Sequence, residues 1–418
     1  AKGAIMITVE SAVEIILKKI KPLGLESVDA LSALTRVLGK DIRATRPNPP
    51  WDNSAMDGYA LKSADIEKAS KDSPVRLKVV YDLPAGQVPK GPVGDNEAVR
   101  IMTGAPVPVG ADAVVMVEKT ERGPDGFVLI KEGARKGENV RRSGEDFKMG
   151  DIVVPAGSVV RPAEVSMLAT VGAPFVLVHK RPRVAVLSTG DELVDINEAP
   201  GLGKISNSNG YALSALVMDS GAVPINLGIA RDSKESLREK LSVAMACDAI
   251  ISSGGVSVGD YDFVKDVLKE LGSEMIFWKV AMKPGKPLAF GIIGGKPAFG
   301  LPGNPISSMV AFEQFVRPAL LKMSGRKKIF SALISATLAK DIKIKPGRMN
   351  FIRAEVRIDG PGVTATPLEG QGSGVISTMV RANAFVVVPK DSEGFKAGEI
   401  VKVQPFDPSV FTKDTPGY

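Results

Sequence analysis

The sequence predicts a multidomain protein that combines one α/β domain with β-rich parts on both sides of it. Between residues 181 and 325, predicted strands alternate with amphipathic helices, which indicates a mostly parallel sheet covered by helices on both faces. Residues 51–146 and 329–418 instead contain short apolar runs separated by Pro, Gly and Asp turns, a pattern typical of small β-barrels or sandwiches. The length of 418 residues also suggests about two to four domains.

The N-terminal region begins with two predicted helices. Thr8 is a suitable cap for a helix that ends near Ile20, because the apolar residues of this segment recur on one face. A second helix is predicted over residues 29–38, with Gly39 as its C-terminal stop. The proline-rich run 46–50 then breaks the periodicity and marks a domain junction.

These changes of pattern divide the chain into four predicted domains. A discontinuous N-terminal helical and linker domain takes residues 1–46 and 147–178, and a β-rich domain of residues 47–146 is inserted into it. The α/β domain takes residues 179–325. A C-terminal β-barrel domain takes residues 326–418.

The composition excludes several kinds of site. With one cysteine, Cys247, and one histidine, His179, the chain can form no internal disulfide and has almost nothing from which to build a zinc site or a Ser-His-Asp triad. Cys247 lies at the end of an apolar stretch and is expected to be buried. The chemistry is therefore expected to depend on carboxylates, lysines, arginines, hydroxyls and backbone amides.

The same composition bears on location and partners. The net charge of +7 is spread along the chain and 5% of the residues are aromatic, so no nucleic acid is expected as a partner. No run of 18 apolar residues occurs, so no membrane-spanning helix is expected. The low cysteine content fits a cytoplasmic, reducing location.

Three strands of the predicted α/β domain end in loops of small residues, at 187–193, 252–262 and 301–308. Parallel strands would bring these loops to one edge of the sheet, where backbone amides and helix N-termini favour anions. One such loop is more often a simple tight turn, but three together favour a phosphate or nucleotide site. Neither a Walker P-loop nor a Rossmann GxGxxG is present. The substrate-binding residues expected here are Thr189, Gly190, Ser253, Gly254, Gly255, Ser257, Pro302, Gly303, Asn304 and Pro305.

Carboxylates accompany these loops. Asp191, Glu192 and Asp232 follow strands, and Asp260 and Asp262 lie in the second loop. Two unit charges about 4 Å apart repel each other by roughly 4 kcal/mol at an effective dielectric constant near 20. Converging carboxylates therefore need a cation, a proton or a nearby lysine, whereas isolated ones would be solvated surface acids. Oxygen ligands suit Mg²⁺ and a phosphate substrate.

A lysine loop follows in the sequence. Lys279, Lys283 and Lys286 lie within a short segment that Pro284 and Gly285 constrain. Such a loop is equally compatible with a solvated basic turn. Beside anion-binding loops, however, it favours contacts to phosphate or to an oxyanion such as molybdate.

The β-rich part contains three further polar turns. One presents Asp57, the second presents Thr103, and the third pairs two arginines with two acids and ends at Asp146. Taken singly, each of them indicates only a turn.

Together these segments resemble the MoeA family, which includes the E domains of gephyrin and of plant Cnx proteins. The matching strings run in order along nearly the whole chain: SAMDGYA, RIMTGAPVP, RRSGEDF, RVAVLSTGDELV, SNSNGY, ISSGGVSVGDYD, FWKVAMKPGKP, FGLPGNPISS, GRMNFIRAE and GQGSGVIS. The resemblance implies a three-layer α/β domain that binds molybdopterin and an elongated homodimer. It also implies an active cleft between this α/β domain and the β-rich parts of the partner subunit.

The implied reaction is the Mg²⁺-dependent insertion of molybdate or tungstate into adenylylated molybdopterin, with release of AMP. The catalytic positions that the resemblance assigns are Asp57, Thr103, Asp146, Glu192, Asp232, Asp262, Lys279 and Lys283. Among these, Mg²⁺ would be held by Glu192, Asp232 and Asp262, where the register of the following segment favours Asp262 over Asp260. Lys286, Arg353 and Ser373 complete the expected substrate-binding set.

Two other functions share features with this sequence. The adenylyltransferase that makes the adenylylated pterin uses the same α/β domain but needs no flanking β domains, and its consumption of ATP would distinguish it. A non-catalytic scaffold related to gephyrin would be expected to carry a long linker and extra domains. A transferase is expected to make transient contacts with the pterin adenylyltransferase and with enzymes that accept the cofactor.

Overall fold

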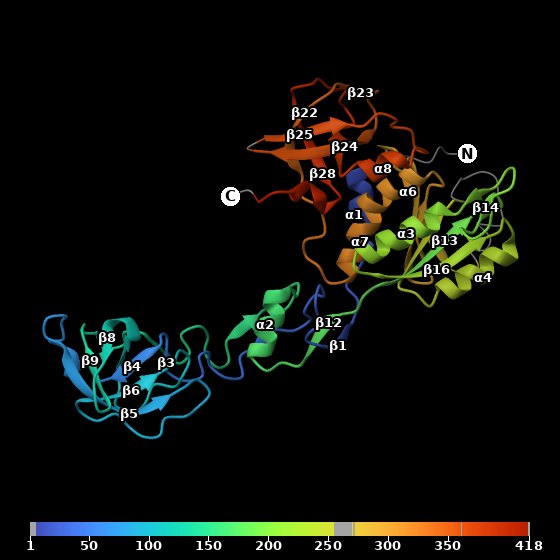
Figure 1. Ribbon diagram of the computed structural model, residues 1–418. Helices are drawn as coiled ribbons and strands as arrows, with labels where there is room; N and C mark the ends of the chain where they lie inside the picture. The colour runs from blue at the N-terminus through green and yellow to red at the C-terminus, as the bar shows by residue number, and fades with distance from the viewer. Residues whose placement is uncertain (1–5, 255–269, 271, 361, 417–418) are drawn as a thin grey trace.

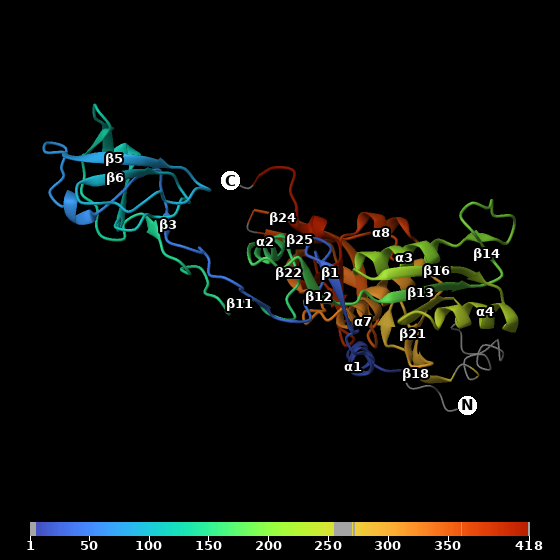
Figure 2. The ribbon, with the colours of Figure 1, turned by 90° about the horizontal axis from the view of Figure 1, so that it is seen from below.

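The computed structural model describes residues 6–254, 270, 272–360 and 362–416 and shows an elongated molecule (Figure 1). A large body contains the α/β sheet and the C-terminal sheet. A smaller β-rich body lies at the other end, joined to the rest by two extended chain segments (Figure 2). None of the helices in the described ranges is both long enough and apolar enough to cross a membrane.

The smaller body is built on a mixed sheet with the strand order β7-β4-β6-β5-β9-β8. Its inner strand β4 is buried on both faces: Tyr59 and Leu61 pack into one apolar cluster and Ala60 into another. The elements of this body are β3 (Asn53–Ser54), β4 (Gly58–Leu61), η1 (Ser63–Ile66), β5 (Val75–Leu83), β6 (Glu97–Ile101), β7 (Ala113–Met116), η2 (Val117–Lys119), β8 (Thr120–Arg122), β9 (Phe127–Ile130) and β10 (Val140–Arg141).

A narrow linker connects the two bodies. Antiparallel pairs form between β1 (Leu25–Asp29) and β12 (Phe175–His179), and between β2 (Ile42–Arg43) and β11 (Ile152–Val154). Helix α2 (Pro162–Thr170) packs beside them. The predicted first helix is confirmed as α1 (Val9–Lys19), where the Thr8 side chain accepts a hydrogen bond from the Ser11 amide at 3.2 Å. The buried face of α1 packs into the core of the large body.

The second predicted helix, over residues 29–38, is wrong. The Asp29 side chain accepts hydrogen bonds from the amides of Leu31 and Ser32, which starts one turn only. Thr35 then adopts a positive φ of 68°, and its amide donates to the Val160 carbonyl instead of continuing a helix. Tertiary hydrogen bonds thus replace the helical ones, and the predicted stop at Gly39 has no helix to end.

The large body holds a six-stranded sheet with the order β16-β13-β17-β21-β20-β18. The first four strands of this order are parallel, and β20 is antiparallel to both of its neighbours. The strands are β13 (Arg183–Thr189), β16 (Val223–Ala230), β17 (Ala249–Ser253), β18 (Ser273–Lys279), β20 (Pro287–Ile293) and β21 (Lys296–Leu301), with a small pair β14 (Leu193–Val194) and β15 (Ile205–Ser206) beside them.

Helices cover both faces of this sheet, so the predicted α/β architecture is confirmed. One face of β13 packs with α3 (Ser208–Asp219), α6 (Pro305–Ala311) and α7 (Arg317–Met323), and the other face packs with α4 (Lys234–Ala244). A π-helical stretch, η3 (Phe312–Val316), joins α6 to α7. Cys247 is buried in the second of these layers, as the sequence predicts, and burial raises the pKa of its thiol.

The C-terminal sheet closes into a barrel-like ring, as predicted, because β24 pairs with both β25 and β26. Strand β19 lies between β18 and β20 of the α/β sheet along the chain but pairs with β24, so it ties the two parts of the large body together. The elements are β19 (Met282–Lys283), β22 (Ile334–Leu338), β23 (Ile342–Lys343), β24 (Met349–Asp359), β25 (Gly362–Pro367), α8 (Ser377–Arg381), β26 (Ala384–Val388), β27 (Gly394–Phe395), β28 (Ile400–Pro405) and η4 (Pro408–Phe411).

Candidate substrate site at the strand ends

The predicted meeting of three strand ends is confirmed. Ser188 near the end of β13 is in register with Ser253 at the end of β17, and Ser253 is in register with Leu301 at the end of β21. The loops that follow these strands therefore begin side by side at the carboxyl edge of the sheet. This edge is where ligands bind in open α/β sheets.

Hydrogen bonds connect these loops to one another. Thr189 Oγ1 donates to the Ser253 carbonyl at 3.4 Å, and Ser253 Oγ donates to the Pro302 carbonyl at 3.3 Å. Asn209, from the first turn of α3, donates through Nδ2 to Ser253 Oγ and to the Gly303 carbonyl, both at 2.7 Å. The predicted residues Thr189, Ser253, Pro302 and Gly303 thus form one polar cluster.

Asn209 is a member of this cluster that the sequence prediction missed. It belongs to the string SNSNGY, which carried the family resemblance but supplied no residue to the predicted site. A signal was available, because a polar side chain in the first turn of a helix lies close to the loops at the strand ends. Only the three-dimensional pairing shows that the side chain bridges two of these loops.

Two of the predicted glycines allow close approach of backbone and side chains. Gly254 has a φ of +84°, and a Cβ there would lie 2.5 Å from the Thr189 carbonyl oxygen. Gly190 has a φ of +141°, and a Cβ there would meet the Glu192 carboxylate, the end of a flexible side chain that can move. The Cβ at Gly254 would instead meet backbone, so glycine is needed there for the close packing of the two loops.

The proline loop leads into α6 as predicted. Asn304 precedes the helix and Pro305 is its first residue, although the Asn304 side chain makes no capping hydrogen bond. The Ile306 amide donates to the carbonyl oxygen of Ser373 at 3.2 Å. This contact brings a residue predicted from the C-terminal part of the sequence directly onto the strand-end loops.

An acidic group lies beside the β13 and β16 ends. The Asp232 amide donates to Asp191 Oδ1 at 3.1 Å. Burial raises the pKa of Asp232, and the nearby charges of Asp191 and Glu192 raise it further. The neighbouring cations Lys204 and Arg231 donate to backbone carbonyls rather than to these carboxylates. Converging carboxylates of this kind fit a divalent cation, whose charge would offset their repulsion.

The predicted magnesium ligands are only partly visible. Glu192 and Asp232 lie in the acidic group, but Asp262 and its alternative Asp260 fall outside the described residues, as do Gly255 and Ser257. Within the ranges that the structure describes, no three His, Cys, Asp or Glu side chains are grouped closely enough to hold a metal ion. The proposed ligand set therefore stays a prediction.

The lysine loop joins the α/β sheet to the C-terminal sheet. Lys279 ends β18, and Lys283 lies in β19, opposite Asn350 of β24. A Cβ at Gly285 would lie 3.5 Å from the Ser307 carbonyl of α6, so the loop also packs against the proline-loop helix. Lys283 and Lys286 are exposed to solvent. These contacts hold the predicted lysines beside the junction of the two sheets.

Arg353 is a fully buried cation at the same junction. Its Nη2 donates to the carbonyls of Gly370 at 3.0 Å and Gly372 at 3.1 Å. Its Nε and Nη1 atoms are buried without a hydrogen-bond partner in the described part of the chain, and burial lowers its pKa. A buried guanidinium with free donors is costly unless an anion pairs with it. Arg353 therefore fits a site for an anionic ligand.

The three polar turns of the β-rich body form one surface. Thr103 donates to Asp57 Oδ1 through its amide and its hydroxyl, both at 2.7 Å, and these bonds hold the pKa of Asp57 below its usual value. Arg142 donates to Asp52 at 2.6 Å. Asp146 accepts from Asn48 Nδ2 at 2.9 Å. Hydrogen bonds from Thr103 to Asp57 and from Arg142 to Asp52 thus join the three turns to one another.

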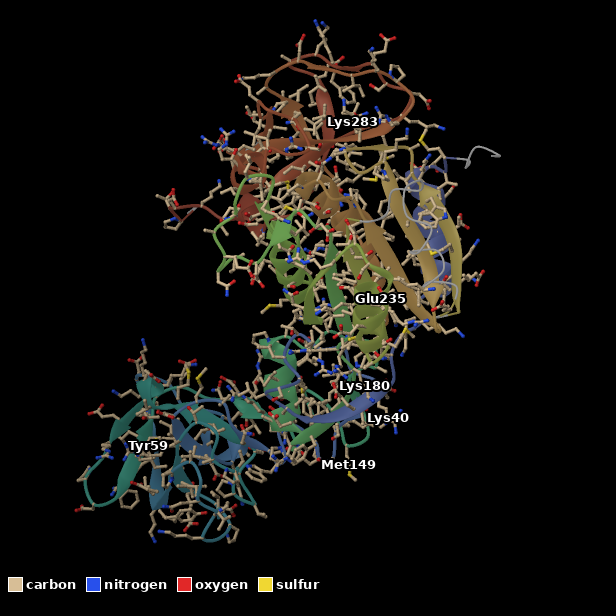
Figure 3. The ribbon with its side chains drawn as sticks, turned by 90° about the vertical axis from the view of Figure 1, so that its right-hand side faces the viewer. Lys40, Tyr59, Met149, Lys180, Glu235 and Lys283 are labelled. Carbon is tan, nitrogen blue, oxygen red and sulfur yellow. The ribbon has the colours of Figure 1, made fainter. Side chains whose placement is uncertain are left out.

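The structure separates this surface from the strand ends within one chain. In Figure 3, Tyr59 of β4 lies in the β-rich body and Lys283 lies at the opposite end of the molecule. Asp57 and Thr103 belong to the first body, whereas Glu192, Asp232 and the lysine loop belong to the second (Figure 1). The single chain therefore holds two groups of predicted site residues that do not meet.

The fold defines a multidomain α/β protein with a polar cluster at the strand ends and a barrel-like C-terminal part. Three protein-family models match the chain. The model described as "MoeA N-terminal region (domain I and II)" matches residues 7–172, the one described as "Probable molybdopterin binding domain" matches residues 185–322, and the one described as "MoeA C-terminal region (domain IV)" matches residues 335–406. The chain belongs to the MoeA family.

Known relatives resemble the chain over most of its length. A molybdopterin molybdenumtransferase of Staphylococcus aureus (strain COL) is 39% identical over 401 residues, which is 95% of each chain. A protein of the same name from a Nostoc species is 39% identical over 90% of this chain and 88% of its own. The crystal structure of a molybdopterin biosynthesis MoeA protein from Pyrococcus horikosii, 36% identical, covers 96% of this chain and 100% of its own with a TM-score of 0.82.

Proposed function

We propose that this chain is a molybdenumtransferase that inserts molybdate or tungstate into adenylylated molybdopterin and releases AMP. The observation that carries this proposal is the buried guanidinium of Arg353, which has two donor atoms without partners in the described part of the chain. It binds the Gly372 carbonyl, and the next residue, Ser373, accepts a hydrogen bond from Ile306 of the proline-loop helix. Such a cation suits an oxyanion substrate, because Arg presents several donors in a fixed geometry. The names of the relatives from Staphylococcus and Nostoc support the transfer of molybdenum to molybdopterin.

The strand-end loops are proposed to bind the pterin nucleotide. Their glycines let backbone approach the ligand closely, and the polar cluster of Thr189, Ser253 and Gly303 offers hydrogen bonds. The exposed side chains of Lys283 and Lys286 attract the substrate phosphates and the metal oxyanion, together with Lys279 at the end of β18. The two pterin thiols then displace one oxygen of the oxyanion, which leaves as water with the two thiol protons, and one water molecule cleaves the phosphoanhydride to give AMP and the pterin phosphate. This balance requires no protein nucleophile.

The acidic group is proposed to hold Mg²⁺. Glu192 and Asp232 are the described members, and Asp262 is the third expected ligand. The raised pKa of Asp232 supports this assignment, because carboxylates that repel one another are stabilised by a divalent cation. When bound, Mg²⁺ would neutralise the charge of the phosphoanhydride.

A homodimer is proposed to complete the site. Asp57, Thr103 and Asp146 lie in or beside the β-rich body, at a distance from the strand ends of the same chain (Figure 1). A second copy of the chain could bring its own β-rich surface to these strand ends, as expected for a cleft between subunits. The enzyme is further proposed to act in the cytoplasm and to contact the pterin adenylyltransferase and cofactor-accepting enzymes transiently.

The test is a reconstituted reaction. Purified protein is mixed with adenylylated molybdopterin, Mg²⁺ and molybdate, and the release of AMP is measured. The proposal predicts AMP release that requires protein, molybdate and Mg²⁺ together, and a repeat with tungstate measures the metal preference. Bound adenylylated molybdopterin without AMP release would contradict the proposal and would favour a carrier or scaffold role. Release of pyrophosphate from ATP with metal-free molybdopterin would instead favour an adenylyltransferase.

A further inference from the structure

Asn209 lies among the strand-end loops, and the nitrogen of its side-chain amide donates hydrogen bonds to two of them. Its Nδ2 donates to Ser253 Oγ and to the Gly303 carbonyl, both at 2.7 Å. Because a backbone carbonyl can only accept, the nitrogen must face Gly303, and this fixes the direction of the other amide atom, Oδ1. The side chain is thus held by two separate loops, with its carbonyl oxygen in a defined position.

This carbonyl oxygen has no partner. Asn209 Oδ1 is buried and accepts no hydrogen bond from any residue that the structure describes. Buried polar atoms in folded proteins are almost always paired with protein, water or ligand. An unpaired acceptor that two substrate-binding loops hold in place is therefore a feature of a binding site.

The neighbouring Asn207 shows the contrasting case. Its Oδ1 accepts hydrogen bonds from the Gly210 amide at 3.0 Å and from Ser188 Oγ at 2.7 Å, so it caps α3 and is satisfied within the protein. Two asparagines of one short segment therefore differ in kind. The Oδ1 of Asn207 caps the N-terminus of α3, whereas the Oδ1 of Asn209 has no partner among the described residues and can accept a hydrogen bond from a ligand.

Because Asn209 Oδ1 can only accept a hydrogen bond, its ligand must offer a donor. Phosphates and metal oxyanions offer mainly acceptor atoms, so they do not match a carbonyl oxygen, whereas the aminopyrimidine ring of a pterin carries N–H donors along one edge. Asn209, Ser253 and Gly303 all lie in residues 185–322, which match the family model of a probable molybdopterin-binding domain. We propose that Asn209 Oδ1 accepts a hydrogen bond from the N–H edge of the pterin ring and fixes the orientation of the pterin; this rests on the proposed function.

The test compares two ligands that share the loops but differ in the pterin ring. Dissociation constants are measured anaerobically for metal-free molybdopterin and, separately, for AMP, with the wild type, Asn209→Ala and Asn207→Ala. Asn209→Ala should raise the dissociation constant for molybdopterin by about tenfold, the effect expected of one lost hydrogen bond in a closed site. Its dissociation constant for AMP should stay within about twofold of the wild type, because AMP carries no pterin.

The control variant separates binding from folding. Asn207→Ala should lower the thermal midpoint through the loss of a helix cap without changing the ratio of the two dissociation constants. If Asn209→Ala is too unstable to measure, Asn209→Ser keeps a polar residue in the first helical turn but cannot reach the pterin, and it should show the same selective loss. Equal losses for both ligands, or no loss for either, would overturn the proposal. A wild type that binds AMP but no molybdopterin would overturn the proposed function as well.

Discussion

The β-rich body and the strand-end edge both carry carboxylates, but the two environments act on them in opposite ways. Asp57 accepts two hydrogen bonds from Thr103, which lower its pKa and hold it as an anion of fixed direction. Asp232 lies half-buried near Asp191 and Glu192, and its pKa is raised. One region thus presents an anion that the protein already satisfies, and the other presents anions that need a cation.

The two regions therefore have complementary electrostatic requirements. Asp57 needs nothing further from its own body, so its remaining carboxylate oxygen is free to contact a ligand. The large body has complementary features: Arg353 of β24 has two buried donors that no described residue accepts from, and Asp232 lies near two other carboxylates. Substrate and Mg²⁺ together would satisfy both requirements, while the β-rich surface supplies the pre-formed acid.

The largest effect is expected at Arg353. Arg353→Lys keeps a positive charge but replaces a fork of several donors by a single ammonium group, which cannot reproduce the paired contacts. AMP release should fall by about a hundredfold, as for the loss of one preorganised donor at a reacting anion. A steady-state assay of AMP release measures this change.

Arg317 provides the matched control for Arg353. It is also a poorly exposed arginine of the large body, but it is paired with Glu313 at 2.7 Å and with Asp219 at 2.8 Å. Arg317→Lys should lower the thermal midpoint and leave AMP release of the folded protein unchanged. Equal rates for the two lysine variants would show that Arg353 acts only in folding.

The second effect concerns the acid of the β-rich body. Asp57→Asn keeps an oxygen that accepts from Thr103 but removes the charge, so the local fold should persist while AMP release falls by about tenfold or more. Thr103→Val removes only the hydroxyl donor, since the Thr103 amide still binds Asp57, and should cost about threefold. Circular dichroism checks the fold of both variants. Wild-type rates for Asp57→Asn would remove the β-rich surface from the site.

A third effect, on stability, tests the close packing of the strand-end loops. Gly254→Ala places a Cβ 2.5 Å from the Thr189 carbonyl oxygen at a φ of +84°. It should lower the free energy of unfolding by about 3 kcal/mol, from the positive φ and the clash together. Gly221→Ala has a similar φ of +77° but meets no atom within 4 Å, so it should cost only about 1 kcal/mol. Urea denaturation measures both, and equal losses would show that the loops are not closely packed.

The smallest effect is the pH dependence of stability at Asp232. Its pKa is raised from 3.8, so between that value and the raised one the folded state binds more protons than the unfolded state. Stability therefore falls as pH rises through this window and stays lower above it. Asp57, whose pKa is lowered, has the opposite sign: it stabilises the fold above 3.8, and this is lost as pH falls through its folded pKa.

The variant Asp232→Asn measures how much the charge of Asp232 contributes to the stability of the fold. Without Mg²⁺ at neutral pH, the variant should melt about 1 °C higher than the wild type, because one of the repelling charges is gone. Added Mg²⁺ should stabilise the wild type more than the variant. A lower melting temperature for Asp232→Asn without Mg²⁺ would mean that the carboxylate is already satisfied by the protein.

Sequence patterns predicted the site best where they depended on strand direction. The ends of β13, β17 and β21 meet as predicted, because parallel strands place their carboxyl ends at one edge. Asn209 was missed because its bonds to Ser253 and Gly303 join segments that are far apart in the chain. The unpaired donors of Arg353 were also unpredictable, since burial in the closed C-terminal sheet is a tertiary property.

The fold shows the same limit. The periodic segment after Thr8 forms its helix, whereas residues 29–38 do not, although both have apolar residues at helical spacing. The difference lies in long-range partners: the Thr35 amide binds the Val160 carbonyl, and the Gly39 amide binds the Leu177 carbonyl. Local periodicity contains no information about hydrogen bonds to residues more than a hundred positions away in the chain.

The central claim is that the two regions form one site only when two copies of the chain combine, and mixed dimers test it most directly. Asp57→Asn and Arg353→Lys chains with different affinity tags are co-expressed, and dimers that contain one chain of each kind are purified by both tags. If the β-rich surface of one chain serves the strand ends of the other, each mixed dimer holds one intact site and should release AMP at about half the wild-type rate. Mixed dimers no more active than either variant alone would contradict the shared site.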